Sequence, residues 1–237
     1  RSRWQPAVVP GCVHRDLHRT GQIPDPFFAA NELSLQWIEE RDWEYRAAFH
    51  VPAALLAEEE VELVCDGLDT LATVFLNDTR VATSDNMFVP LRISVRAHLR
   101  RGRNELRIVF ASAAVAVRVT RLEHQPPKEF NDPVGRGSVL RKQPSQFGWD
   151  WAPRLLTAGI WRDLRLEAWT GNRLESVRIA QHHAPDGSVA LTLTPELARP
   201  DPLVTYYVTI SLSGSGVAEL RGPTESLTTT LTSPQLW

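Results

Sequence analysis

The sequence predicts an all-β protein made of two consecutive antiparallel β-sandwiches. Three observations indicate this fold class. Hydrophobic and polar residues alternate with a period of two from Trp43 onwards, turn residues recur about every ten positions, and helix-like stretches are rare. Short strands between frequent turns are typical of sandwiches, in which each sheet buries one face against the other.

The first forty residues are interrupted by prolines and glycines, so we expect extended and loop structure there. In 43–51, Trp43, Tyr45 and Phe49 alternate with polar residues, which predicts a strand with one face in water. The later strand candidates of this sandwich are 61–65, 71–76, 80–83, 89–95, 105–110 and 162–169. Asn77 and Asp78 predict a hairpin turn, and we expect a second, exposed turn at 100–104.

Residues 111–123, rich in Ala and Val, are the helix candidate of the first part of the chain. Residues 125–137 form a long loop with three prolines, and such loops usually carry function or cover a site. This loop leads directly into a tryptophan-rich segment, so we expect both on one rim of the sandwich. Thr170, Gly171 and Asn172 mark the domain boundary, which gives a first domain of residues 1–170.

The second domain, 171–237, has more Ser and Thr and fewer aromatic residues. Its strand candidates are 174–181, 189–194, 203–212, 217–221 and 227–231. Their spacing is typical of an immunoglobulin-like sandwich, which needs about seven strands. We therefore expect an immunoglobulin-like domain that is truncated before its last strands. The exposed sheet edge of such a fragment could pair with a second copy as an edge-strand dimer.

Composition excludes several function classes. A net charge of −2 and 43 % hydrophobic residues are typical of a soluble globular protein. Lys128 and Lys142 are the only lysines among 26 cationic residues, and the arginines are spread along the chain and balanced by 28 acidic residues. This distribution does not produce the basic face that nucleic acid requires. No apolar run is long enough to span a membrane.

The sequence indicates neither a metal nor a cofactor. Cys12 and Cys65 are far apart and lack metal-ligand spacing; two free thiols are the commoner case, although one disulfide would also fit. His14 and His18 are four residues apart, but Arg15 stands where a zinc-protease motif needs its glutamate, so we interpret both as non-ligands. Phosphate-loop and dinucleotide fingerprints are absent.

Residues 141–154 are the strongest candidate for a functional site. Trp149, Asp150 and Trp151 lie between Arg141 and Arg154, in a segment whose Gly and Pro residues prevent a helix or a continuous strand. Aromatic rings with a few convergent polar groups suit a sugar, because its C–H faces pack on rings while its hydroxyls need directed hydrogen bonds. Equally, the rings could fill the core, with Asp150 in a salt bridge to Arg141 or Arg154.

The stretch FGWDWAPR, residues 147–154, resembles the FGWDWGPR loop of family 2 β-mannosidases. PGCVH (10–14) with DPFF (25–28), WIEERDWEYR (37–46) and SPQLW (233–237) resemble three further stretches of that family, in the same order. Ala152 departs from the family's glycine, which affects backbone freedom more than chemistry.

The resemblance implies a jelly-roll, galactose-binding-like first domain and identifies the chain as the non-catalytic N-terminal part of a retaining β-mannosidase. Such enzymes hydrolyse terminal β-linked mannose with two carboxylates about 5 to 5.5 Å apart. In the family both are glutamates on a C-terminal barrel that would follow residue 237, so we expect no catalytic residue and no activity in this chain. The resemblance assigns substrate binding to Trp149, Asp150 and Trp151, with Arg141 and Arg154 in support.

The expected partners are a β-mannoside oligosaccharide and the chain's own catalytic barrel. One alternative is a stand-alone carbohydrate-binding module that uses the same aromatic rim. Another is a structural sandwich of a related β-galactosidase or β-glucuronidase type of enzyme. Continuation of the gene past Trp237 into a barrel with two glutamates would separate the first interpretation from the others. The sequence is silent on the cellular compartment.

Overall fold

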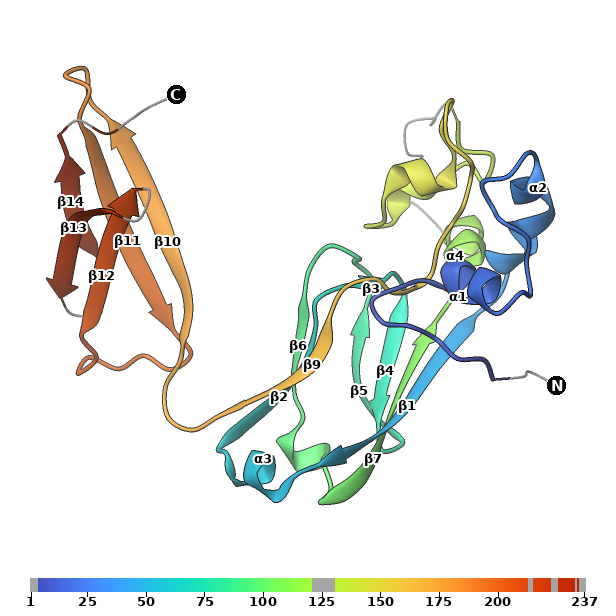
Figure 1. The fold of residues 1–237 in the computed structure, drawn as a ribbon, viewed down its shortest axis with the longest axis horizontal. Helices are drawn as coiled ribbons and strands as arrows, with labels where there is room; N and C mark the ends of the chain where they lie inside the picture. Colours follow the sequence, from blue (N-terminus) through green and yellow to red (C-terminus); the bar gives the residue numbers. More distant parts are fainter. Residues whose placement is uncertain (1–3, 121–130, 213–214, 223–225, 233, 235–237) are drawn as a thin grey trace. The chain divides into compact units, whose positions relative to one another are not determined.

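The computed structural model describes residues 4–120, 131–212, 215–222, 226–232 and 234. The chain forms two compact units, Arg1–Thr170 and Gly171–Trp237, shown in Figure 1. Most elements are strands, and all paired strands run antiparallel. The prediction of an all-β sandwich protein is confirmed.

The described residues of the first unit form two larger sheets and one short strand pair. The first sheet has the order β1 (Trp43–Val51), β7 (Gly102–Phe110), β4 (Ala72–Leu76) and β5 (Thr79–Ser84). The second has the order β6 (Leu91–Ser94), β2 (Glu60–Cys65) and β9 (Leu164–Trp169). The short pair is β3 (Leu68–Asp69) with β8 (Gly159–Ile160).

The core of this unit lies between the two larger sheets and is built from alternate residues of their strands. Its most buried members are Val61, Leu63 and Cys65 of β2, Ala72, Val74 and Leu76 of β4, and Leu106, Ile108 and Phe110 of β7. On β1, the half-buried Trp43 and Tyr45 alternate with the exposed Glu44 and Arg46, as the period predicts. Full burial of one large aliphatic or aromatic side chain contributes about 1.5–3 kcal/mol, so this set supplies most of the driving force.

The prediction of only extended and loop structure over residues 1–40 is wrong. The structure places α1 (Val13–Arg19), α2 (Asn31–Leu35) and the 3₁₀ helix η1 (Gln36–Ile38) there. α1 buries Val13 and Leu17, which are four residues apart on one face. A helix of seven residues is too short to show a helical period in sequence, and its packing against the sandwich stabilises it instead.

The helix candidate at 111–123 is confirmed over α4 (Ala113–Val119), while 121–123, and 125–130 of the expected loop, lie outside the described residues. Ser112 caps α4 by accepting a hydrogen bond from the backbone of Val115. The other short helices are α3 (Ala53–Ala57), η2 (Arg96–His98), η3 (Gly137–Val139) and η4 (Pro144–Phe147). Figure 1 shows α1, α2 and α4 gathered with the yellow segment at one end of the strands.

Both predicted turns are present, and the second differs from the prediction only at its last residue, which is buried. Asn77 and Asp78 both have positive φ, 49° and 68°, and join β4 to β5 as a tight hairpin. At 100–104 the side chains of Arg100, Arg101 and Arg103 are exposed, as expected, although β7 already begins at Gly102 and Asn104 is buried. The Asn104 amide donates to the carbonyls of Arg100 and Gly102, so it closes the turn from inside.

The second unit contains all five of the strands that the sequence predicts. β10 (Leu174–His183), β11 (Val189–Leu197) and β14 (Leu227–Leu231) form one sheet, and β12 (Tyr206–Leu212) pairs with β13 (Ser215–Gly222). β11 buries Val189, Leu191 and Leu193, whereas β10 lies at the sheet edge and is exposed along its whole length.

Candidate functional site

The candidate site is residues 143–156, which we call the tryptophan segment. It begins with η4, whose last residue, Phe147, is fully buried. Phe147 belongs to a small hydrophobic cluster whose other buried members are Ala114, Val117 and Leu156. Gly148 follows with φ 142°, and a Cβ there would overlap the carbonyl oxygen of Asn131. Only glycine therefore allows the chain to turn outwards immediately after the buried phenylalanine.

Trp149, Asp150 and Trp151 form the exposed tip of the segment. Trp149 is 46 % and Trp151 80 % exposed, and their ring centroids are 6.1 Å apart with planes inclined by 75°. A backbone bridge between Trp149 and Ala152 closes the tip. Asp150 is exposed, and within the described residues its carboxylate has no ion pair or hydrogen bond. The tip thus presents two large rings and an unengaged carboxylate to solvent.

The structure pairs Arg154 with Glu39 rather than with Asp150. The Arg154 guanidinium also donates to the side-chain oxygen of Gln36 and to the carbonyl oxygen of Phe147. Arg154 therefore ties the second half of the segment to η1 and to the start of the tip. Arg141 lies before the segment, with its side chain exposed and its carbonyl accepting from the backbone of Met87.

Glu39 is a buried carboxylate, with 5 % of its side chain exposed. Burial raises its pKa, and the adjacent Arg154 opposes that rise. The Glu39 carboxylate is therefore partly dehydrated, and Arg154 favours its charged form.

A second, fully buried ion pair lies below the segment. Lys142 Nζ is 2.5 Å from Asp69 Oδ1 and donates to the carbonyl oxygen of Thr157 at 2.7 Å. The Thr157 hydroxyl donates to Asp69 Oδ2 at 2.6 Å, and the Thr70 hydroxyl donates to Asp69 Oδ1 at 2.5 Å. The lysine and aspartate side chains are 0 % and 2 % exposed. Burial lowers the pKa of Lys142, an effect that Asp69 opposes.

His14 and Cys12 lie close to this ion pair. His14 is buried, and its Nδ1 has no hydrogen-bond partner among the described residues. Burial, reinforced by the positive charge of Lys142, lowers the pKa of His14 to about 4. Burial raises the pKa of Cys12, and both Cys12 and Cys65 are free thiols. Burial also raises the pKa of Cys65, so both thiols lack the negative charge that would make them reactive near neutral pH.

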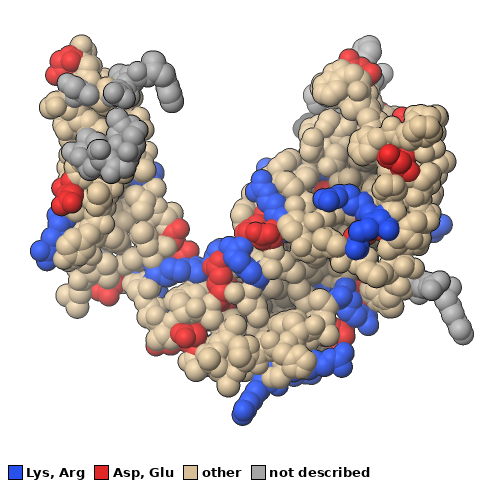
Figure 2. Space-filling model, in the orientation of Figure 1, with Lys and Arg blue, Asp and Glu red and all other residues tan. Residues whose placement is uncertain are grey.

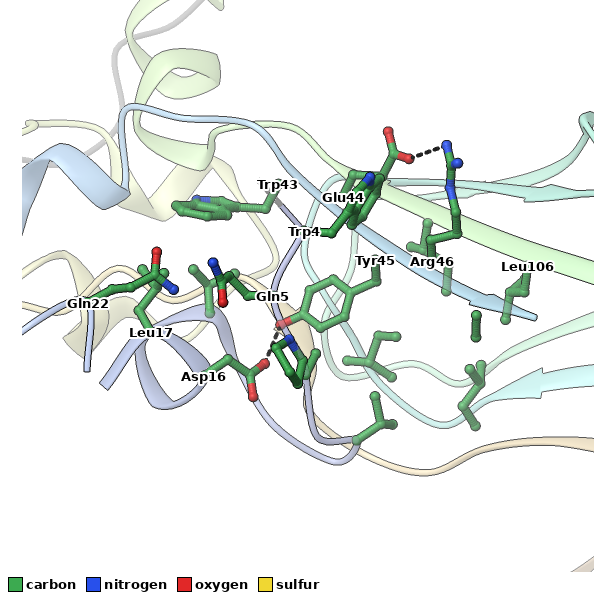
Figure 3. Close-up of a pocket in the computed structure, with 18 of the residues that line it drawn as sticks. Trp4, Gln5, Asp16, Leu17, Gln22, Trp43, Glu44, Tyr45, Arg46 and Leu106 are labelled. Carbon is green, nitrogen blue, oxygen red and sulfur yellow. Dashed lines mark hydrogen bonds and ion pairs between the residues drawn. The ribbon is translucent and has the colours of Figure 1, made fainter. Parts of the chain in front are cut away.

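A separate pocket of about 430 Å³ lies beside β1, and Figure 3 shows it. Trp4, Trp43 and Tyr45 contribute rings to its lining, and Asp16 is a polar group at its edge. Both oxygens of Asp16 are occupied, one by the backbone of Val8 and the other by the Tyr45 hydroxyl at 3.4 Å. This pocket offers hydrophobic surface, but its carboxylate is already used within the protein.

The part of the chain that the structure describes contains neither a cluster that could bind a metal nor a membrane-spanning helix. There, no group of three or more His, Cys, Asp and Glu side chains could hold a metal ion. No described helix is both long and apolar enough to cross a membrane. Figure 2 shows cationic and acidic side chains mixed over the visible face of the first unit.

Sequence reasoning identified the tip but missed the side chains that hold it. Asp69, Thr157 and Glu39 lie outside the tryptophan segment. Glu39 falls within 37–46, one of the stretches that resemble the family, but nothing in the sequence links it to Arg154. One signal was available. Lys142 is one of only two lysines in an arginine-rich chain, which marks a position where the compact ammonium group is required.

Several known proteins are similar to this chain. β-Mannosidase B from Emericella nidulans is 37 % identical over 240 residues, covering 97 % of this chain and 28 % of that protein. β-Mannosidase B from Thermothelomyces thermophilus is 44 % identical over 164 residues, covering 68 % of this chain and 19 % of that protein. The chain thus spans less than a third of the length of these curated relatives.

Solved structures give the same picture. The β-D-mannosidase from Dictyoglomus thermophilum has a TM-score of 0.85 and 31 % identity, covering 100 % of this chain and 30 % of that chain. The exo-chitosanase from Amycolatopsis orientalis, at 20 % identity and a TM-score of 0.61, shares the fold. Residues 1–162 match the family described as glycosyl hydrolase 2 galactose-binding domain-like. Since this match covers more than half of the chain, the protein belongs to the galactose-binding domain-like family of glycosyl hydrolase 2.

Proposed function

We propose that this chain is the part of a retaining β-mannosidase that supplies the tryptophan segment to the active site. The rest of that site would be formed by the enzyme's own C-terminal catalytic barrel. The observation that carries the proposal is the unengaged Asp150 carboxylate between two exposed rings, on a segment anchored by buried groups on both sides. Relatives named β-mannosidase B support the choice of a terminal β-mannoside as substrate.

In this proposal Trp149 and Trp151 pack against the sugar, and Asp150 accepts hydrogen bonds from its hydroxyls. Arg154 supports the tip through Phe147 and Glu39, and Arg141 supports the entry to the segment. Because hydrogen bonds to a charged group contribute about 1.5–3 kcal/mol, Asp150→Ala in the complete enzyme should lower kcat/KM about 10- to 100-fold. Such a loss requires that Asp150 touches the substrate.

We also infer that residues 1–170 form a jelly-roll domain and that 171–237 form part of an immunoglobulin-like domain. Two glutamates on the barrel would perform the retaining chemistry. The isolated chain should then not hydrolyse an aryl β-mannoside. Hydrolysis that co-purifies with the chain and disappears in Asp150→Asn would contradict this assignment.

The decisive test is Asp150→Asn in the complete enzyme, with kcat/KM and Tm measured together. The substitution keeps the shape of the side chain and removes its charge, so we expect a normal Tm and a large loss of kcat/KM. Asp78→Asn is a matched control, because Asp78 is exposed in the β4–β5 turn, where asparagine tolerates positive φ. Unchanged kinetics in Asp150→Asn would show that the tip is only scaffold.

Two alternatives give different results. A stand-alone carbohydrate-binding module would bind manno-oligosaccharides as the isolated chain, which calorimetry would detect. A structural sandwich of a β-galactosidase or β-glucuronidase type of enzyme would bind none, and Asp150→Asn would leave the kinetics of the complete enzyme on its own glycoside unchanged. The exposed edge strand β10 supports one further proposal, a dimer of the isolated chain by edge pairing, which sedimentation would detect.

A further inference from the structure

The buried Lys142–Asp69 pair joins the two ends of the tryptophan segment. Lys142 is the residue immediately before the segment, and Thr157 is the residue immediately after it. The lysine ammonium bonds to the Thr157 carbonyl, and the Thr157 hydroxyl bonds to the Asp69 carboxylate. Gln146 adds a further link, since its side-chain oxygen accepts from the Thr157 backbone at 3.2 Å. Entry and exit therefore meet at one point.

That meeting point is part of the sandwich itself. Asp69 is the last residue of β3 and is paired in register with Gly159 of β8. The segment therefore cannot shift as a rigid flap without breaking contacts to a strand. The carboxylate accepts three hydrogen bonds, from Lys142, Thr70 and Thr157, which fixes its orientation.

Global stability does not explain why this position holds charges. Replacing a buried ion pair by uncharged groups of similar volume is often neutral or stabilising, because dehydration of two charges offsets their attraction. What the charges provide is geometry, since a fully buried ammonium group needs its acceptors in fixed directions. A hydrophobic pair would fill the same space without fixing the direction in which the segment leaves the sandwich.

Three ties act together on the segment. Lys142 and Asp69 hold its ends, Phe147 fills the hydrophobic cluster, and Arg154 binds Glu39. The tip between Phe147 and Arg154 is the exposed part. A sugar-binding group must be held within about 0.5 Å of its working position, so such ties matter most next to a binding residue.

We propose that Lys142 and Asp69 are positioning residues, which hold both ends of the tryptophan segment so that Asp150 meets the sugar in a fixed geometry. This inference rests on the proposed function for its consequence in catalysis. Its structural half concerns the free chain and is measurable without substrate.

The first test is hydrogen exchange on the chain carrying Lys142→Met together with Asp69→Asn. The double variant keeps volume and leaves no unpaired charge, so Tm should stay within a few degrees. Amides of residues 143–156 should exchange at least tenfold faster. The matched control is Arg92→Met with Glu62→Gln, which removes the ion pairs of Arg92 with Glu62 on β2 and Glu167 on β9 without touching the segment; Glu167 keeps its pair with Arg165. Equal exchange in the double variant and the parent would overturn the inference.

A second variant covers the case in which the double variant does not fold. Thr157→Val is isosteric and removes the hydroxyl that ties the exit of the segment to Asp69, while the ion pair stays. Exchange near residues 155–158 should rise about threefold or more. If the exchange rate of these amides does not rise in a folded Thr157→Val variant, the proposal that Lys142 and Asp69 hold the ends of the segment is contradicted.

The final test is a double-mutant cycle in the complete enzyme. The Lys142→Met/Asp69→Asn variant should lower kcat/KM about tenfold in the parent but by less than twofold in the Asp150→Asn background. Equal losses in both backgrounds would show that the pair does not act through Asp150. If Asp150→Asn itself is silent, the proposed function fails, whereas faster exchange of the segment still supports the structural half of the inference.

Discussion

Acid should destabilise the first unit through His14, and a single substitution should remove this effect. His14 is 6 % exposed and faces the charged groups Lys142 and Asp69. Its pKa in the folded protein is about 4, compared with about 6.5 in an unfolded chain. As pH falls below 6.5 the unfolded chain binds a proton that the folded protein does not bind until about pH 4. Stability from this group is therefore complete above pH 6.5 and is lost towards pH 4.

The size of the effect follows from the interval between the two pKa values. One pH unit inside that interval corresponds to about 1.4 kcal/mol, so moving from pH 7 to pH 5 should cost about 2 kcal/mol. For a unit of this size, Tm should fall by about 4–8 °C from this group alone. Glu39, whose pKa burial raises, acts in the opposite direction at the acid end of the range.

The assay is Tm against pH, from 7 to 4.5, for the parent and for His14→Leu. Leucine fits a buried helical position and cannot be protonated. Between pH 7 and pH 5 the free energy of unfolding of the variant should therefore fall by about 2 kcal/mol less than that of the parent. His18→Leu is the matched control, because His18 lies one turn further along α1 and is exposed. An acid slope in His14→Leu equal to that of the parent would refute the reasoning.

Three further predictions concern the tryptophan segment and the second unit. Gly148→Ala should destabilise the first unit by about 2–4 kcal/mol in chemical denaturation, because φ is 142° and the methyl group would overlap Asn131; a loss below about 0.5 kcal/mol would contradict the described turn. Arg154→Met should lower the free energy of unfolding by about 3 kcal/mol near pH 7, because it leaves the buried Glu39 carboxylate unpaired. The loss should become smaller at acid pH, because Glu39 has a raised pKa and becomes protonated there. A loss that does not change with pH would argue against the pair. Hydrogen exchange should be faster in β10 than in β2, because β10 is an exposed edge strand; equal protection in a monomer would disprove this.

The sequence by itself determined most of the strands and the main hairpin, and it located the tryptophan-rich segment. Alternation in 43–51 and the Asn77–Asp78 turn are local properties of the chain, because a strand's period and a turn's φ angles depend on neighbouring residues. The Gly and Pro residues of 141–154 likewise predict a loop, whereas residue types alone left open whether its rings are exposed or fill the core. These features need no knowledge of which strands become neighbours.

Only the tertiary structure decided what holds the tip. Lys142 and Asp69 are 73 residues apart in sequence, and Arg154 and Glu39 are 115 apart. Many carboxylates could pair with either cation, and their charges alone do not select one. Strand pairing and burial select the partner, because they place one carboxylate within hydrogen-bond distance and exclude the water that would otherwise solvate both groups.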